Sequence, residues 1–186
     1  MPRLFFVALL LLTSPAAFAS PTTLGSPASS TPDSTALSAD TASLDNIIAA
    51  LYDVISGPAG QERDWDRMRS LFLPESQLIP TRIQADSSYA HLVMSVDDYI
   101  ETSGPWMLEN GFFEVELARK TEQFGATTHV WSTYEGRMTQ DGEVVLRGVN
   151  SIQALWDGSR WWIVNVFWSP EHPGNELPAA YLPSDG

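Results

Sequence analysis

The strongest constraint on the fold is a long run of alternating sequence between Phe112 and Trp168. Apolar and polar residues alternate along it, as in strands with one face on a core. Two Asp-Gly pairs, Asp141-Gly142 and Asp157-Gly158, interrupt the alternation, and Asp-Gly is a strong local signal for a β-hairpin turn. We therefore expect a meander of four antiparallel strands, over residues 112–122, 126–140, 143–156 and 159–168.

The residues before this run have the period of helices. Apolar positions recur three and four residues apart over residues 44–55, after Ser43 as a suitable N-cap. A second short helix is predicted over residues 64–72, with Asp64 as its N-cap. The segment 77–94 resembles two short strands around a polar loop.

A third helix is predicted from Ser95 to about Glu109. Ser95 and Asp98 have the spacing of a capping box, and Asn110-Gly111 ends the pattern. Gly104-Pro105 could interrupt this helix. With the helices first and the strands after them, the fold class is α+β: N-terminal helices packed in the concave face of a curved antiparallel sheet, forming a cone.

The N-terminus has the pattern of an export signal. Residues 1–19 contain Arg3, an apolar run from Leu4 to Leu12 and a small-residue end suited to signal peptidase. Residues 20–40 are rich in Ser, Thr, Pro and Ala, which predicts a disordered linker. We expect residues 41–186 to form a single domain, with a C-terminal tail from about residue 170, located in the periplasm or outside the cell.

Composition excludes several classes of function. The chain has no cysteine, so disulfides, thiol catalysis and a lipidated anchor are excluded. Its formal net charge is −13, with only ten Lys and Arg, which disfavours nucleic acid and anionic membranes as partners. No metal-binding or phosphate-binding motif is present, and we expect no metal or cofactor.

The ending DGSRWWIVNVFWS, residues 157–169, resembles the nuclear transport factor 2-like superfamily. Gly57-Pro58, Asp64-Trp65 and Leu71-Phe72 support the resemblance at the other end, so it covers residues 43–170. This group includes ketosteroid isomerases, SnoaL-like polyketide cyclases and scytalone dehydratase. The resemblance implies a cone-shaped fold that hosts enzymes, binding modules and assembly domains alike, and it points the side chains of Trp161 and Ile163 into the cone.

Two-residue turns at both Asp-Gly pairs would fix which residues face the cone. Gln140 would then pair with Glu143, and Trp156 with Ser159. The predicted inner face contains His129, Trp131, Thr133, Glu135, Gly148, Asn150, Ile152, Trp161, Ile163, Asn165 and Phe167. A β-bulge would break this register.

Within that face, Thr133, Asn150 and Asn165 would form one polar row. The row has two interpretations: it contacts a ligand in an apolar pocket, or the amides bond to each other or to a helix and complete a polar core. On the first interpretation a small apolar or amphipathic ligand is bound by Trp131, Thr133, Asn150, Asn165 and Phe167.

The opposite face would expose one apolar strand surface, formed by Trp162, Val164, Val166 and Trp168. An exposed patch of this kind is unusual on a soluble monomer. A homodimer through this face is our first expectation, and docking of the C-terminal tail across it is the second.

Evidence for catalysis is weak in the sequence. Glu135 and His129 are the candidate acid-base residues, although a solvated ion pair with Arg137 is the better explanation of Glu135. Tyr134 is expected on the outer face. Three functions therefore remain: a small-molecule-binding domain, a lyase or isomerase of the SnoaL or ketosteroid isomerase type, and a dimerisation or assembly module.

Overall fold

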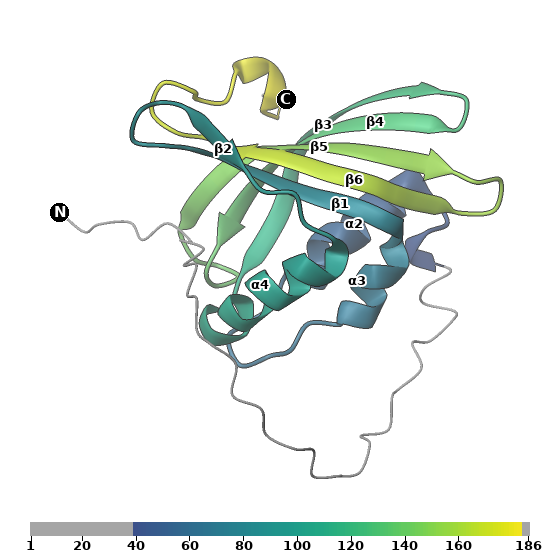
Figure 1. Ribbon diagram of the computed structural model, residues 1–186, viewed down its shortest axis with the longest axis horizontal. Helices are drawn as coiled ribbons and strands as arrows, with labels where there is room; N and C mark the ends of the chain where they lie inside the picture. The colour runs from purple at the N-terminus through teal and green to yellow at the C-terminus, as the bar shows by residue number, and fades with distance from the viewer. Residues whose placement is uncertain (1–38, 184–186) are drawn as a thin grey trace, which may run out of the picture. The chain divides into compact units, whose positions relative to one another are not determined.

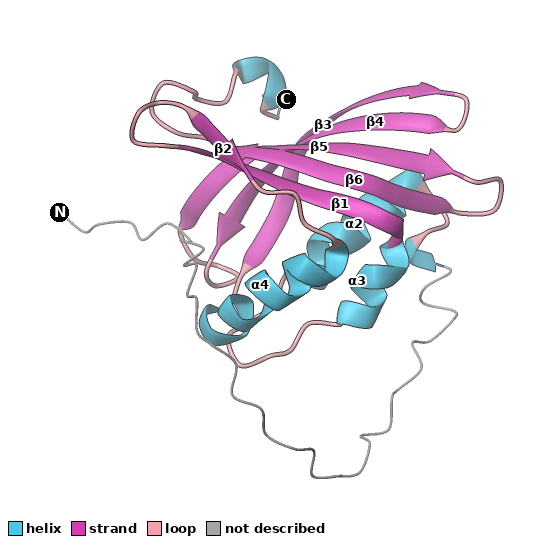
Figure 2. Ribbon diagram, viewed as in Figure 1, coloured by secondary structure: helices cyan, strands magenta, loops and turns pink. Residues whose placement is uncertain are grey.

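The structure, a computed structural model, describes residues 39–183, in which helices cover one face of a curved six-stranded sheet (Figure 1). The predicted signal peptide and most of the predicted linker lie outside the described residues. The sheet face against the helices is called the inner face, and the opposite one the outer face. This α+β arrangement confirms the predicted fold class (Figure 2).

The helices begin and end where the capping residues predict. Helix α2, Leu44–Ile55, starts after Ser43, whose hydroxyl accepts a hydrogen bond from the backbone N–H of Asn46 at 3.1 Å. Helix α3, Trp65–Leu71, starts after Asp64. Helix α4, Val96–Asn110, has the predicted capping box and continues through Pro105, so the interruption considered for it is absent.

The sheet contains the four predicted strands and two more. The meander consists of β3 (Phe113–Phe124), β4 (Thr127–Arg137), β5 (Val144–Trp156) and β6 (Trp161–Pro170). Strands β1 (Phe72–Ile83) and β2 (Tyr89–His91) are the predicted short pair. The order is β2-β1-β6-β5-β4-β3, and β1 pairs with β6 in parallel, which the expectation of an antiparallel sheet did not include.

The core lies between the helices and the inner face. Its fully buried side chains come from α2, α3 and the central strands, and include Ile47, Ile48, Met68, Leu71, Val130, Ile152 and Ile163. Among the described residues, no helix is long and apolar enough to cross a membrane.

The predicted register between β4 and β5 is wrong by one residue. Thr133 pairs with Val149 and Ser132 with Asn150, because the connection after Gly136 is irregular and longer than a two-residue turn. A slip of one residue exchanges the two faces of a strand. Tyr134 therefore points inward, where it is 2% exposed, and the prediction that placed it outward is wrong.

Strand β6 changes face part of the way along. Trp156 pairs with Trp161 across a four-residue loop, and Trp161 and Ile163 point inward as predicted. A bulge at Val164 then shifts the pairing, so Asn165 pairs with Gln153 instead of Asn150. Because of this extra residue, Asn165 lies on the outer face.

Candidate functional site

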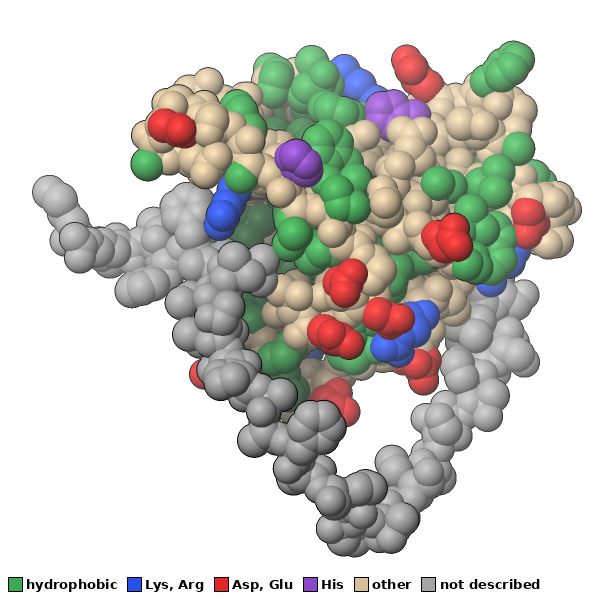
Figure 3. Space-filling model, in the orientation of Figure 1, with side chains coloured by type: hydrophobic (Ala, Val, Ile, Leu, Met, Phe, Trp, Pro, Cys, Tyr) green, Lys and Arg blue, Asp and Glu red, His purple; other side chains and the backbone are tan. Residues whose placement is uncertain are grey.

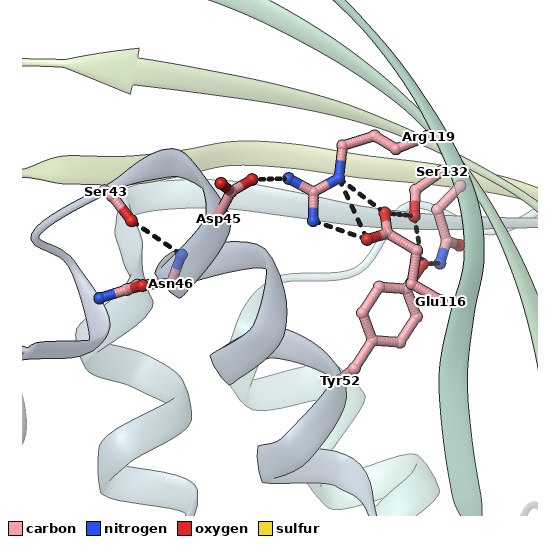
Figure 4. Close-up of polar contacts among 8 residues, drawn as sticks. Ser43, Asp45, Asn46, Tyr52, Glu116, Arg119 and Ser132 are labelled. Atoms are coloured by element: carbon pink, nitrogen blue, oxygen red, sulfur yellow. Dashed lines mark hydrogen bonds and ion pairs between the residues drawn. The ribbon is translucent and has the colours of Figure 1, made fainter.

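A chain of hydrogen bonds crosses the interior from α2 to the sheet (Figure 4). The hydroxyl of Tyr52 lies 2.7 Å from that of Ser132 and accepts a hydrogen bond from the amide of Asn150 at 3.0 Å. Burial raises the pKa of Tyr52 above its usual value. The tyrosine is therefore neutral and joins one helix to two strands as a hydrogen-bonding group.

The chain continues through Glu116 to the protein surface. The hydroxyl of Ser132 donates to Glu116, and Arg119 donates to both oxygens of this carboxylate, with its closest contact at 2.6 Å. Arg119 also pairs with Asp45 of α2 at 2.6 Å (Figure 4). Every member of this chain has a partner, so we interpret it as a structural connection between α2 and strands β3, β4 and β5.

Glu114 lies next to this chain but outside it. It precedes Glu116 by two residues on β3, is half-buried, and pairs with the buried Gly136 of β4. Burial raises the pKa of its carboxyl to about 8, and a hydrogen bond with the side chain of Asn150 partly offsets this rise. At neutral pH the carboxyl is therefore mostly protonated and can donate a hydrogen bond.

Three tyrosines lie near enough to this carboxyl for its charge to affect their pKa values. Burial, and after it the negative charge of Glu114, raise the pKa of both Tyr99 and Tyr134 above the usual value, and Glu114 contributes in the same direction to Tyr52. The phenol groups are thus neutral and close to Glu114. The protonated carboxyl of Glu114 is therefore a hydrogen-bond donor in neutral surroundings.

Two glycines make room for these groups. A Cβ at Gly148 of β5 would collide with the backbone oxygen of Ser169 and lie 2.6 Å from the hydroxyl of Tyr134. A Cβ at Gly136 would lie 3.0 Å from Leu146 and 3.1 Å from Phe112. Gly148 thus lies where the backbone at Ser169 and the hydroxyl of Tyr134 approach β5 closely.

A pocket of about 410 Å³ opens beside Glu114, between α2 and the start of β3. Half-buried Glu114 and buried Tyr52 are among its lining residues. The remaining lining residues are Ala49, Asp53, Ser56, Phe113, Val115, Arg137 and Gln140. Its size lies within the range of small-molecule sites.

Most of the predicted ligand-binding residues lie elsewhere. Asn150 is the one that points into the interior. Trp131, Thr133, Asn165 and Phe167 belong to the outer face, for the register reasons given above, and Phe167 is 46% exposed. The predicted row of Thr133, Asn150 and Asn165 is not formed.

The two candidate acid-base residues are also on the outer face. Glu135 forms an ion pair with Arg137, as the ion-pair explanation predicted. His129 lies 3.0 Å from the hydroxyl of Ser151 and edge-on to Trp131. Neither residue lines the pocket beside Glu114.

The sequence pattern did not reveal Glu114. In Phe113 to Leu117 the apolar residues alternate with Glu114 and Glu116, and such a pattern normally places the acids in solvent. Here Val115 is the exposed residue, at 44%. A glycine at the paired position 136 is the one available signal of inward space, and it depends on a register that the sequence left open.

The predicted apolar outer surface differs in composition from the expectation. Val166 is buried in the core, and Trp168 packs edge-on against Tyr99 on the inner side. Tyr181 in the tail, within the short helix η1 (Ala179–Tyr181), packs against Trp131 at 5.7 Å and lies under the amine of Lys120. The tail thus contacts the outer face, and the homodimer stays a prediction.

The rest of the surface carries many charged groups. Acidic and basic side chains lie side by side over the helices in Figure 3. Arg69 of α3 forms ion pairs with Asp66 and with Asp97 of α4. Among residues 39–183, no cluster of three or more His, Asp or Glu is placed to hold a metal ion.

Comparison with solved structures gives the class of fold. A protein of unknown function with a cystatin-like fold from Nostoc punctiforme aligns at TM-score 0.52 and 8% identity, over 69% of this chain and 88% of the other. The structure of LinA aligns at TM-score 0.51 and 7% identity, over 74% and 92%.

An NTF-2 like protein of unknown function from Silicibacter pomeroyi aligns at TM-score 0.48 and 14% identity, over 70% and 94%. Comparison of the sequence with family models and with curated proteins gives no match. The chain shares the cystatin-like fold of the Nostoc punctiforme protein, a curved sheet covered by helices on one face, and this cone is the fold that the resemblance in its sequence implied. At these identities the similarity shows the fold alone.

Proposed function

We propose that this protein binds a small molecule in the pocket beside Glu114. The observation that carries the proposal is the position of the Glu114 carboxyl, which points inward among three tyrosines and borders a pocket of about 410 Å³. Burying a carboxyl costs free energy unless a hydrogen-bond partner replaces the water that it loses. Glu116, two residues away, has its partners within the protein, whereas Glu114 has the amide of Asn150 and the pocket.

The lining indicates the chemistry of the ligand. Phe113, Val115 and Ala49 supply apolar surface, while Glu114 supplies a hydrogen-bond donor at one end. Asp53, at the rim, is already paired with Arg67 at 2.5 Å. A small amphipathic molecule with a carbonyl or hydroxyl oxygen at its polar end fits this arrangement, because its oxygen would accept from the protonated carboxyl.

A blocking substitution tests the site without touching the core. Ala49 is exposed on α2 and lines the pocket, so Ala49→Trp fills the pocket and leaves the fold intact. The probes are acetophenone, cyclohexanone and 2-naphthol, measured by saturation-transfer NMR. We expect saturation transfer to the wild type and to Ala42→Trp, a matched control on an exposed position, and its loss in Ala49→Trp and Glu114→Leu. Equal signals from all four proteins would refute the proposal.

Acid-base catalysis is the second candidate function. Its support is the pKa of Glu114 near 8, since a general acid or base works best with a pKa close to the working pH. The carboxyl would exchange protons with a carbon next to a bound carbonyl, as in a lyase or isomerase. The predicted roles of Glu135 and His129 are not part of this proposal, because both lie on the other face.

Hydrogen–deuterium exchange distinguishes catalysis from binding. Deuterium incorporation next to the carbonyl of cyclohexanone, followed by proton NMR, should rise through pH 8 in the wild type and fall to the uncatalysed rate in Glu114→Gln. Binding of cyclohexanone without enhanced exchange would support the binding function and contradict the catalytic one.

Export is a further part of the proposal. The signal-like pattern of residues 1–19 supports it. Edman sequencing of the protein purified from its native source should begin at Ser20. An intact N-terminal Met1 would contradict export by this route.

A further inference from the structure

The outer face of the sheet contains a row of three amide side chains that continues to a histidine. Gln77 of β1 pairs with Asn165 of β6, which pairs with Gln153 of β5, which pairs with His129 of β4. Paired residues point to the same side of a sheet, so the four side chains stand next to one another. With neighbouring strands about 4.8 Å apart, the row is about 14 Å long.

The amides in this row have no hydrogen-bond partner within residues 39–183. Side-chain hydrogen bonds are absent at Gln77, Gln153 and Asn165, and His129 bonds to Ser151 alone. None of the four side chains is buried. Three adjacent amides therefore present both donors and acceptors outward from a rigid sheet, at fixed spacing.

Aromatic side chains lie along one side of the amide row. The next row contains Trp131, Ser151, Phe167 and Ile79. Phe167 is 46% exposed, and the indole N–H of Trp131 is buried with no partner among the described residues. Tyr181 in the tail stands against Trp131 and borders this surface.

We propose that these two rows bind a neutral oligosaccharide. Aromatic rings cover the apolar faces of sugar rings, and planar amides bond to neighbouring hydroxyls as donor and acceptor at once. The eight residues of the two rows include no Asp, Glu, Lys or Arg, and the nearest charges, Glu122 and Lys120 of β3, stand at the end of the rows beside His129 and Trp131. An uncharged ligand therefore meets no charged side chain along the rows themselves, and the net charge of −13 gives no attraction to an anionic one.

A second copy of this chain fits the surface less well. Interfaces between copies bury their hydrogen-bonding groups in pairs, and three unpaired amides in the middle of a dimer interface would each cost free energy. A saccharide, which carries a hydroxyl on nearly every carbon, can satisfy all of them.

Calorimetric titration of the full chain with three probes tests this inference. The probes are cellohexaose, maltohexaose and hexa-N-acetylchitohexaose. We expect at least one to bind, and Asn165→Ala or Gln153→Ala to weaken its binding about tenfold each. Phe167→Ala should weaken it by at least as much, and Gln77→Ala serves as a further variant at an exposed position if a central one fails to fold.

Controls separate this surface from the pocket and from general effects. Gln123→Ala changes an exposed amide outside the two rows, and Phe124→Ala removes the 93% exposed ring at the β3–β4 hairpin. Both should bind the sugar normally, as should Glu114→Leu. Failure of all three sugars to bind, or unchanged wild-type affinity in both Asn165→Ala and Gln153→Ala, overturns the proposal. So does a dimer in light scattering that Phe167→Ala dissociates.

Discussion

Glu114 and Glu116 are two residues apart on one strand and both point into the cone, yet their surroundings differ. Glu116 receives hydrogen bonds from Arg119 and Ser132. Glu114 has the amide of Asn150 and otherwise borders the pocket. Glu116 thus belongs to a closed region of the interior, where its carboxylate has partners within the protein. Glu114 belongs to an open region, where its carboxyl borders the pocket.

A bulge explains the difference. The pairing of β3 with β4 skips Leu117, so Ala118 pairs with Thr133 and Arg119 with Ser132. In a regular strand Arg119 would point away from Glu116, because residues three apart lie on opposite faces. The extra residue turns the guanidinium to the inner face and supplies the counter-charge to Glu116. Glu114 lies before the bulge and receives none.

The largest effect is expected from closing the space beside Tyr134. In Gly148→Ala the new Cβ would collide with backbone at Ser169 and with Tyr134, so the free energy of unfolding should fall by about 3 kcal/mol in urea denaturation. The ring that faces Glu114 would also be displaced.

Gly136→Ala is the matched control for this change. Its new Cβ would meet side-chain atoms of Leu146 and Phe112 at 3.0 and 3.1 Å, which can move, and we expect a loss of about 1 kcal/mol. An equal loss in both variants would show that the position of Tyr134 does not depend on Gly148.

Breaking the closed region should have the next largest effect. Glu116→Gln removes the charge between Arg119 and Ser132, and both ion-pair partners are about one-fifth exposed. We expect the unfolding free energy to fall by about 2 kcal/mol, less than for a fully buried pair. Glu122→Gln, exposed on the same strand, should change it by less than about 0.5 kcal/mol. A similar result for both would mean that Glu116 is not structural.

The two asparagines once expected in one row should now behave differently. Asn150→Ala leaves the buried hydroxyl of Tyr52 with one partner fewer, which should cost about 1.5 kcal/mol in thermal or urea unfolding. Asn165→Ala removes an amide without a protein partner and should cost less than about 0.5 kcal/mol. The reverse order would mean that the bulge at Val164 is absent in solution.

The elements of this fold could be predicted because local signals determine them. Ser43, Asp64 and the Ser95–Asp98 box start the helices where the capping residues indicate, and alternation identifies the strands of the meander. These signals act within a few residues and do not depend on the register of the sheet.

The candidate site could not be predicted because it depends on that register. The loops after Gly136 and Trp156 are longer than two residues, and bulges at Leu117 and Val164 change the face of everything beyond them. Each such irregularity exchanges inward and outward residues. Asn150 kept its predicted direction, whereas Tyr134 and Asn165 exchanged theirs, and Glu114 lies on the inner face opposite Gly136 of β4.

The smallest expected effect, and the most specific to the open region, is a difference in pH dependence. The folded pKa of Glu114 is about 8, above the value of about 4.3 for an unfolded chain. The folded state therefore holds one more proton between these values, so this group's stabilising contribution is complete below about pH 4.3 and is lost as the pH rises through 8.

The variant Glu114→Gln has no titrating carboxyl at this position. Urea denaturation should show it more stable than the wild type by at least about 1 kcal/mol at pH 8.5, a figure reduced for the exposure of the carboxyl to the pocket, and nearly equal to it at pH 4.5. Parallel curves for the two proteins would mean that the carboxyl titrates as in solvent and that the open region of the interior is already hydrated.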